Sequence, residues 1–168
     1  ATVYRTVSAV SDKQAVAELV AANPIYSKAA FYDSHENIKS DLGKLCEDAR
    51  EILSRNRKQD SEILCDRVEE IIDQEFSKES LSLTEVSARL SVSPNYLSTL
   101  IKKVKQKNFV TLLTERRMKE AYNLLTLSAL KILEISEKCG YSDQHYFSYC
   151  FKKYYGLSPN KMRESGRS

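Results

Sequence analysis

Two stretches of similar pattern decide the fold of this chain: VSARLSVSPNYLSTLIKK at residues 86–103 and ISEKCGYSDQHYFSYCFKK at residues 135–153. In each, a short amphipathic helix is followed by a tight turn and by a second helix whose apolar residues recur every three or four positions. Each stretch also ends in a Lys-Lys pair. A single helix-turn-helix pattern occurs in many all-α proteins. Two copies with basic residues at the same place are a much more specific signal.

The sequence around these stretches predicts a mostly α fold. Proline and glycine number three and four in 168 residues, and helical periodicity extends from about residue 37 onward. We predict a seven-helix domain in which helix-turn-helix units at about 82–104 and 131–155 are joined by a long helix at about 110–126. Local signals mark the helix ends: a Ser82 to Glu85 capping box, Ser93-Pro94 at a helix start, and Gly140 and Gly156 at helix ends.

The first part of the chain is different, and we assign residues 1–60 to an N-terminal extension and 61–168 to the main domain. Alternating residues predict strands at 2–10 and 27–33 around a helix at 13–22, which together suggest a remnant of an α/β domain. A helix at 37–55 follows, and the polar stretch SRNRKQDS at 54–61 is interpreted as a hinge. Ser61 is expected to cap the next helix.

The helix predicted at 37–55 carries one apolar stripe that has to be covered. Its members are Ile38, Leu42, Leu45, Ala49, Ile52 and Leu53. This stripe can pack on the N-terminal segment, on the main domain, or on a second copy of itself in a homodimer. Intramolecular packing is the commoner outcome of the three.

Charge is strongly divided along the chain, although the net charge is only +3. Residues 1–82 hold 11 Lys/Arg against 16 Asp/Glu, a net −5, and residues 83–168 hold 15 against 7, a net +8. A basic half of this size suits a polyanion, because cations that neutralise phosphates release condensed counterions. Surface lysines that only serve solubility are the alternative explanation.

Other classes of protein find little support. No apolar stretch approaches the roughly twenty residues that cross a bilayer, so we expect a cytoplasmic protein without a membrane partner. The four cysteines have no metal-ligand spacing, so we expect neither metal nor cofactor, and Cys46 and Cys139 are expected to be buried small hydrophobes. His35, followed by Lys39, is the only catalytic candidate, and without a phosphate loop or acid pair nearby we predict that the protein is not an enzyme.

Residues from about 64 to 164 resemble the DNA-binding domain of the AraC/XylS family of transcriptional regulators. The matching motifs are RMxxAxxLL at 117–125, IxxISxxCGYSD at 132–143 and YFSxxFKKxxGLSP at 146–159. The resemblance implies a sequence-specific DNA-binding transcription regulator whose two recognition helices enter successive major grooves of double-stranded DNA, with RNA polymerase as a further partner. A spacer of about 25 Å agrees with grooves about 34 Å apart.

The resemblance also implies which residues meet the DNA. The base-reading positions fall on Asn95, Ser98 and Thr99 in the first unit and on Gln144, His145, Ser148 and Tyr149 in the second. Asn and Gln can bond adenine edges, and hydroxyl groups can donate or accept. The candidates for phosphate contact are Lys102, Lys103, Arg116, Arg117, Lys152 and Lys153. Helix-dipole complementation is the simpler role of the lysines, and an internal contact is the alternative for Arg117.

The chain departs from the family pattern at three positions. Gln106 stands where many members have a glycine that closes the first recognition helix, so a looser helix end is expected there. Thr99 and Tyr149 stand where a long basic reader is common, and we expect the first unit to discriminate bases less than the second. The main rival function is a helical protein-interaction module without DNA specificity, although the charge division argues against it.

Overall fold

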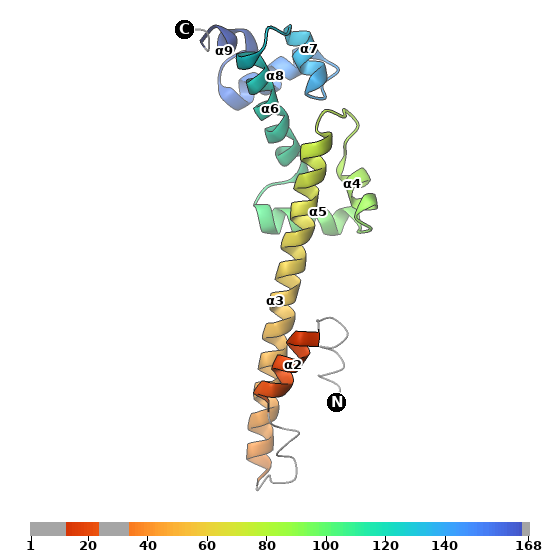
Figure 1. Ribbon diagram of the computed structural model, residues 1–168, viewed down its shortest axis with the longest axis vertical. Coiled ribbons are helices and arrows are strands. Elements are labelled where there is room, and N and C mark those ends of the chain that lie inside the picture. The colour runs from red at the N-terminus through yellow and green to blue at the C-terminus, as the bar shows by residue number, and fades with distance from the viewer. Residues whose placement is uncertain (1–12, 24–33, 166–168) are drawn as a thin grey trace. The chain divides into compact units, whose positions relative to one another are not determined.

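A computed structural model describes residues 13–23 and 34–165 of the chain. Within these residues it contains only helices, as predicted, and Figure 1 shows their order along the chain. They are α2 (Lys13–Ala22), α3 (His35–Glu75), α4 (Leu83–Arg89), α5 (Pro94–Lys105), α6 (Phe109–Leu127), α7 (Ile132–Lys138), α8 (Gln144–Tyr155) and α9 (Pro159–Ser165). The strands predicted at 2–10 and 27–33 lie outside the described residues. No helix in the described part of the chain is both long enough and apolar enough to cross a membrane.

The chain forms two compact units, residues 1–62 and 63–168, and α3 contributes to both. In the first unit Leu19 of α2 packs on Leu45 and Ala49 of α3, and all three side chains are buried. Asn23 follows α2, and its Nδ2 donates to the Asp48 carboxylate at 2.8 Å. The apolar stripe of α3 is therefore covered in part by the N-terminal segment, one of the three outcomes that the sequence left open.

Residues 54–61, predicted as a hinge, are helical and belong to α3. No proline or glycine interrupts this stretch, and the ion pairs Arg55–Glu51 and Lys58–Glu62 join successive helical turns. The Ser61 hydroxyl donates to the Arg57 carbonyl at 2.7 Å inside the helix, so it does not cap a helix start. The polar composition of this stretch is that of a solvated helix.

The second unit contains two hydrophobic cores, one for each helix-turn-helix. Residues of α3, α4, α5 and the start of α6 build the first core, which includes Val68, Leu97 and Ile101. The rest of α6 joins α7 and α8 in the second core around Phe147 and Phe151, whose side chains are fully buried. Seven helices, counting the end of α3, thus make up the predicted domain, and α6 connects its two halves (Figure 1).

Capping side chains explain where three helices of the two helix-turn-helix units begin. Ser82 caps α4 and Ser93 caps α5, each accepting a backbone N–H from three residues later, and Pro94 occupies the first turn of α5. Asp143 caps α8, accepting from the backbone N–H groups of His145 and Tyr146. These two bonds hold the pKa of Asp143 below its usual value.

Two local predictions were wrong. Glu85 does not complete a capping box with Ser82, because its carboxylate pairs with Arg89 one turn further along α4. Cys46 is exposed, whereas Cys139 is buried in the second core as expected, and burial raises the pKa of its thiol to about 12. His35 is exposed at the first position of α3.

Candidate nucleic-acid interface

The helices α5 and α8 are equivalent elements of the two helix-turn-helix units, and their residues correspond at an interval of fifty positions. Both begin after a capping residue, and both end in a residue with left-handed backbone, Gln106 with φ 55° and Gly156 with φ 78°. Each preceding turn also contains one left-handed residue, Ser91 before α5 and Gly140 before α8, although this pair is one position out of the fifty-residue register. The two units therefore present the same helix faces in the same register.

The predicted base-reading residues lie together on the outer face of each helix. The buried residues of α5 and α8, such as Leu97 and Phe147, point to the opposite side. Asn95, Thr99, His145 and Tyr149 are exposed, and Ser98, Gln144 and Ser148 are half-buried. Tyr149 is 62% exposed, so its ring projects from the face of α8. The structure thus gathers all seven residues on two faces, three on α5 and four on α8.

One of these residues has a hydroxyl that is already engaged. Thr99 Oγ1 donates to the Asn95 carbonyl at 2.9 Å within α5. In that arrangement the hydroxyl can still accept a hydrogen bond from a base but has no proton left to donate. This contact agrees with the prediction that the first helix-turn-helix unit discriminates bases less than the second.

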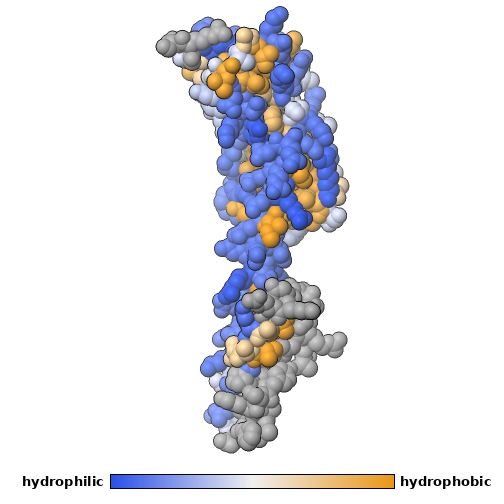
Figure 2. Space-filling view, in the orientation of Figure 1, coloured by the Kyte–Doolittle hydropathy of each residue, from blue (hydrophilic) through white to orange (hydrophobic). Residues whose placement is uncertain are grey.

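The four lysines at the ends of α5 and α8 are available for an outside anion. Lys102, Lys103, Lys152 and Lys153 are exposed, and none forms an ion pair with another described residue. In the view of Figure 2 hydrophilic residues cover much of the second unit, with hydrophobic areas between them. An exposed cation without a protein partner is the kind that a phosphate can neutralise at little cost.

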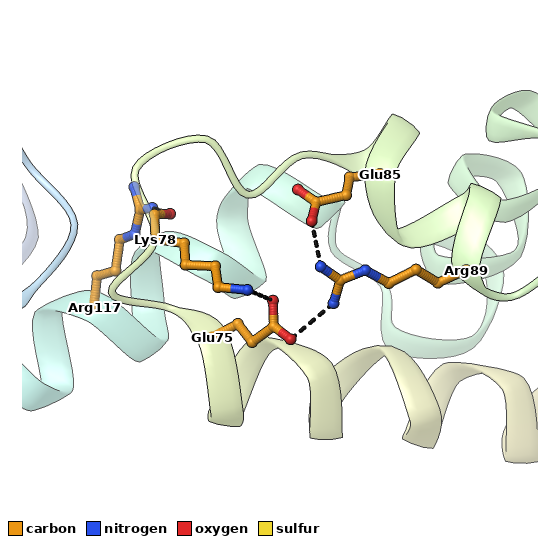
Figure 3. Close-up of polar contacts among 5 residues, drawn as sticks. All are labelled: Glu75, Lys78, Glu85, Arg89 and Arg117. Carbon is orange, nitrogen blue, oxygen red and sulfur yellow. Dashed lines mark hydrogen bonds and ion pairs between the residues drawn. The ribbon is translucent and has the colours of Figure 1, made fainter.

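Other cations of the second unit are already paired with carboxylates. Lys105 Nζ lies 3.0 Å from Asp66 and 2.7 Å from Glu69 of α3. Arg89 lies between the carboxylates of Glu75 and Glu85, as Figure 3 shows. The hydrogen bonds that Arg89 and Lys78 donate to Glu75 lower the pKa of Glu75 to about 2. These acidic residues of α3 hold α4 and α5 in place.

Arg116, a predicted phosphate contact, is engaged in the same way. Its Nε lies 2.8 Å from the Asp73 carboxylate and its Nη1 lies 3.1 Å from Glu120. The guanidinium group also lies over the Phe76 ring, 4.0 Å from its centroid. A phosphate would have to compete with two carboxylates for this side chain.

Arg117, the other arginine predicted to contact phosphate, is buried and only 9% exposed. Its Nε donates to the Phe76 carbonyl and its Nη2 donates to the Lys78 carbonyl, both at 2.8 Å. Figure 3 shows the side chain extending from α6 toward the backbone at Lys78. The internal contact that the sequence left open is the one observed, and this side chain does not face an external ligand.

The structure adds two residues to the candidate interface that sequence reasoning missed. Tyr96 and Tyr146, at equivalent positions of α5 and α8, are 50% and 58% exposed and flank the reading faces. A half-exposed tyrosine combines an apolar ring with a hydroxyl group and suits contact with a sugar-phosphate backbone. The fifty-residue correspondence, which places the same residue type at the same position of both units, was the signal that could have revealed them.

Comparisons with known proteins agree with this geometry. A family described as a helix-turn-helix domain matches residues 86–165. The Msm operon regulatory protein of Streptococcus mutans is 34% identical over 98 residues, which are 58% of this chain and 35% of that protein. The chain thus spans about a third of the length of this curated relative.

Solved structures with the same fold cover nearly the whole second unit. The C-terminal domain of AraT, a response regulator from Geobacillus stearothermophilus, is 44% identical, with a TM-score of 0.60, over 61% of this chain and 84% of that domain. The DNA-binding domain of AdpA, a global transcriptional factor solved with a target DNA, shares the fold at 18% identity, with a TM-score of 0.58, over 61% of this chain and 92% of that domain.

Proposed function

Because the chain belongs to the AraC/XylS family of DNA-binding transcription regulators, we propose that its second unit binds double-stranded DNA with α5 and α8 in successive major grooves. The observation that carries this proposal is the repeated pair of helix faces. Each face combines polar residues that are exposed or half-buried with two exposed lysines that form no ion pair in the described part of the chain. Recognition helices of helix-turn-helix proteins dock in the major groove through such a face.

In this proposal the two helices read bases with different side chains. The first uses Asn95, Ser98 and Thr99, and the second uses Gln144, His145, Ser148 and Tyr149. Gln144 and His145 occupy the first turn of α8, the part of a recognition helix that contacts base edges in helix-turn-helix proteins. Since α8 contributes more donors than α5, we assign the stricter base preference to the second box of the site.

Phosphate contacts are assigned to Lys102, Lys103, Lys152 and Lys153. Such contacts hold the protein in register without reading the sequence. We leave Arg116 and Arg117 out of this set, because Arg116 is paired with Asp73 and Glu120 and Arg117 is buried on backbone carbonyls.

The proposal extends to partners and place of action. The family relationship suggests that the chain regulates transcription in the cytoplasm, by contact with RNA polymerase and without catalysis. A homodimer is proposed through the first half of α3, where Leu42 of the apolar stripe is 44% exposed beside the residues that α2 covers. Sedimentation of the chain and of a Leu42→Glu variant tests this, and a wild-type chain that stays monomeric at high concentration excludes the dimer.

Selection from a library of random DNA duplexes tests the central proposal. We expect enrichment of a site with two boxes about one helical turn apart, and binding that weakens steeply with salt. Gln144→Ala should relax base preference in one box only, whereas Lys152→Ala should weaken binding to all sequences alike. Absence of enrichment together with little salt dependence would reject DNA recognition and favour a protein-interaction module.

A further inference from the structure

A small polar junction joins the two helix-turn-helix units directly, apart from their connection through α6. It is formed by the segment after α3 (Phe76, Lys78 and Glu79), by Arg117 of α6, and by the turn between α7 and α8 (Gly140, Tyr141 and Ser142). The segment after α3 leads into the first helix-turn-helix unit, and the turn between α7 and α8 belongs to the second. Any change in the angle between the units must alter this junction.

Arg117 lies at the centre of the junction and contacts both sides of it. Two of its N–H groups donate at 2.8 Å to the carbonyls of Phe76 and Lys78, which belong to the first unit's entry segment. The same guanidinium lies over the ring of Tyr141 in the second unit, 5.2 Å from the centroid. Tyr141 itself is buried, and burial raises its pKa to about 12. One fixed planar group therefore connects the two units.

The fit around Arg117 leaves no spare room. A Cβ atom added at Gly140 would lie 2.7 Å from the Phe76 carbonyl oxygen and 2.8 Å from Arg117 Nη2, closer than such contacts occur. Gly140 also needs its left-handed backbone, with φ 77°. Beside it, the Ser142 hydroxyl donates to the Glu79 carboxylate across the same boundary. The turn of the second unit is thus held against the first at three neighbouring positions.

These contacts restrict a motion that α6 alone would allow. A single helix connecting two separate cores can bend, since long helices curve readily. The junction lies beside the middle of α6 and ties the entry segment of one unit to the turn that aims α8 in the other. It therefore sets the direction of α8 relative to α5.

We propose that Arg117 is a positioning residue that fixes the interval between the two recognition helices, and hence the spacing of the two boxes that the protein accepts. The inference rests on the proposed function, because spacing has meaning only for a protein that binds two boxes. It replaces the phosphate contact expected from the sequence. Lysine could supply the same charge to a phosphate, but it lacks the planar fork that reaches two carbonyls at once.

Binding to a set of duplexes tests this role. Each duplex carries the two boxes selected by the wild-type chain, separated by the selected interval or by one or two base pairs more or fewer. The wild-type chain should show a sharp optimum. Arg117→Met should lose about tenfold at the optimum but little at the neighbouring spacings, because a looser junction weakens cooperation between the units. Affinity for a duplex with a single box should not change.

Two further variants separate positioning from charge. Arg117→Lys should flatten the spacing preference nearly as much as Arg117→Met, whereas a phosphate contact would be largely preserved by lysine. Arg116→Met removes the same charge from the neighbouring position of α6. Arg116 contacts the junction only through the Phe76 ring, on the side of the first helix-turn-helix unit, and its ion pairs are with Asp73 and Glu120, so none of these contacts reaches the turn at residues 140–142. The spacing optimum should stay sharp in this control.

Ser142→Ala keeps the inference testable if the Arg117 variants fail to fold. The Ser142 side chain is exposed, so its loss should leave folding intact while removing the bond to Glu79 and flattening the optimum to a smaller extent. If Arg117→Met folds, a sharp and unshifted optimum of affinity against box spacing would overturn the inference. If Arg117→Met does not fold, a sharp optimum in Ser142→Ala would overturn it. A wild-type chain that binds no two-box duplex would instead reject the proposed function itself.

Discussion

Removal of one of two lysines on the same helix should change the salt dependence of DNA binding, and removal of the other should not, because only the second has a protein partner. Lys102 and Lys105 both lie in the last turn of α5. Lys102 is exposed and forms no ion pair with the described residues, whereas Lys105 is held by Asp66 and Glu69 at 3.0 and 2.7 Å. The hydrogen bond to Glu69 raises the pKa of Lys105, so this side chain stays charged and engaged.

The size of the effect follows from counterion release. Each phosphate neutralised adds about −0.9 to the slope of log affinity against log salt, so the four free lysines of α5 and α8 together contribute about −3.6. Lys102→Ala should reduce the slope by about 0.9, and between 50 and 200 mM salt the wild-type chain should lose about 3.5-fold more affinity than the variant. Lys105→Ala should leave the slope unchanged.

Fluorescence anisotropy titrations of one selected duplex at four or five salt concentrations measure both slopes. The two variants lose the same charge from the same helix turn, so the general field of the protein changes equally in both, and any difference reports direct phosphate contact. Melting curves of both variants check that the fold is retained. Equal slopes for Lys102→Ala and Lys105→Ala would show that pairing within the protein does not decide which lysines meet the DNA.

Three further predictions concern stability. Gln106→Gly should raise the free energy of unfolding by about 0.5 kcal/mol, since glycine adopts a left-handed backbone without steric strain. The reverse change at the equivalent position, Gly156→Gln, should lower it by about 1 kcal/mol, and urea unfolding of both variants measures the contrast. Asp143→Asn keeps the cap of α8 but removes its titration. The pKa of Asp143 is lowered in the folded state, so the ionised carboxylate stabilises the fold above its usual carboxyl pKa, and this stabilisation is lost as pH falls through the lowered value. The melting temperature of Asp143→Asn should therefore fall less between pH 5 and pH 2 than that of the wild-type chain. Phe151→Ala should cost about 3–5 kcal/mol of unfolding free energy, and a loss under 1 kcal/mol would show that the second core is not packed as described.

Much of the fold could be predicted from the sequence because its signals are local. The helix predicted at 13–22 matches α2, and the spacer predicted at about 110–126 matches α6 at 109–127. Ser93-Pro94 marks the start of α5, and the left-handed Gly140 and Gly156 lie where the sequence placed helix ends. Capping residues, glycine and apolar periodicity act within one or two helical turns, so a single sequence contains them in full.

Features that depend on distant partners could not be predicted in this way. The polar stretch at 54–61 has no apolar stripe, so its helical conformation as part of α3 could not be read from the sequence pattern. Gln106 ends α5 in the left-handed conformation that Gly156 adopts at the end of α8, and its Nε2 donates to the Lys103 carbonyl, a contact that the sequence did not predict. Arginines show the same limit. Arg116 and Arg117 are adjacent in sequence, yet Arg116 pairs with the Asp73 carboxylate and covers the Phe76 ring, whereas Arg117 is buried on the carbonyls of Phe76 and Lys78.

The two reading faces occupy equivalent positions but carry different side chains, and this difference has a consequence for polarity. Where the first face has Asn95 and Thr99, the second has His145 and Tyr149. Symmetric dimers of helix-turn-helix proteins bind palindromes and so have no preferred direction on the duplex. A single chain with two unlike reading faces binds its site in one direction along the duplex. When one molecule is bound upstream of a transcription start site, the orientation of the binding site alone would then decide whether its other surfaces face the start site or point away from it.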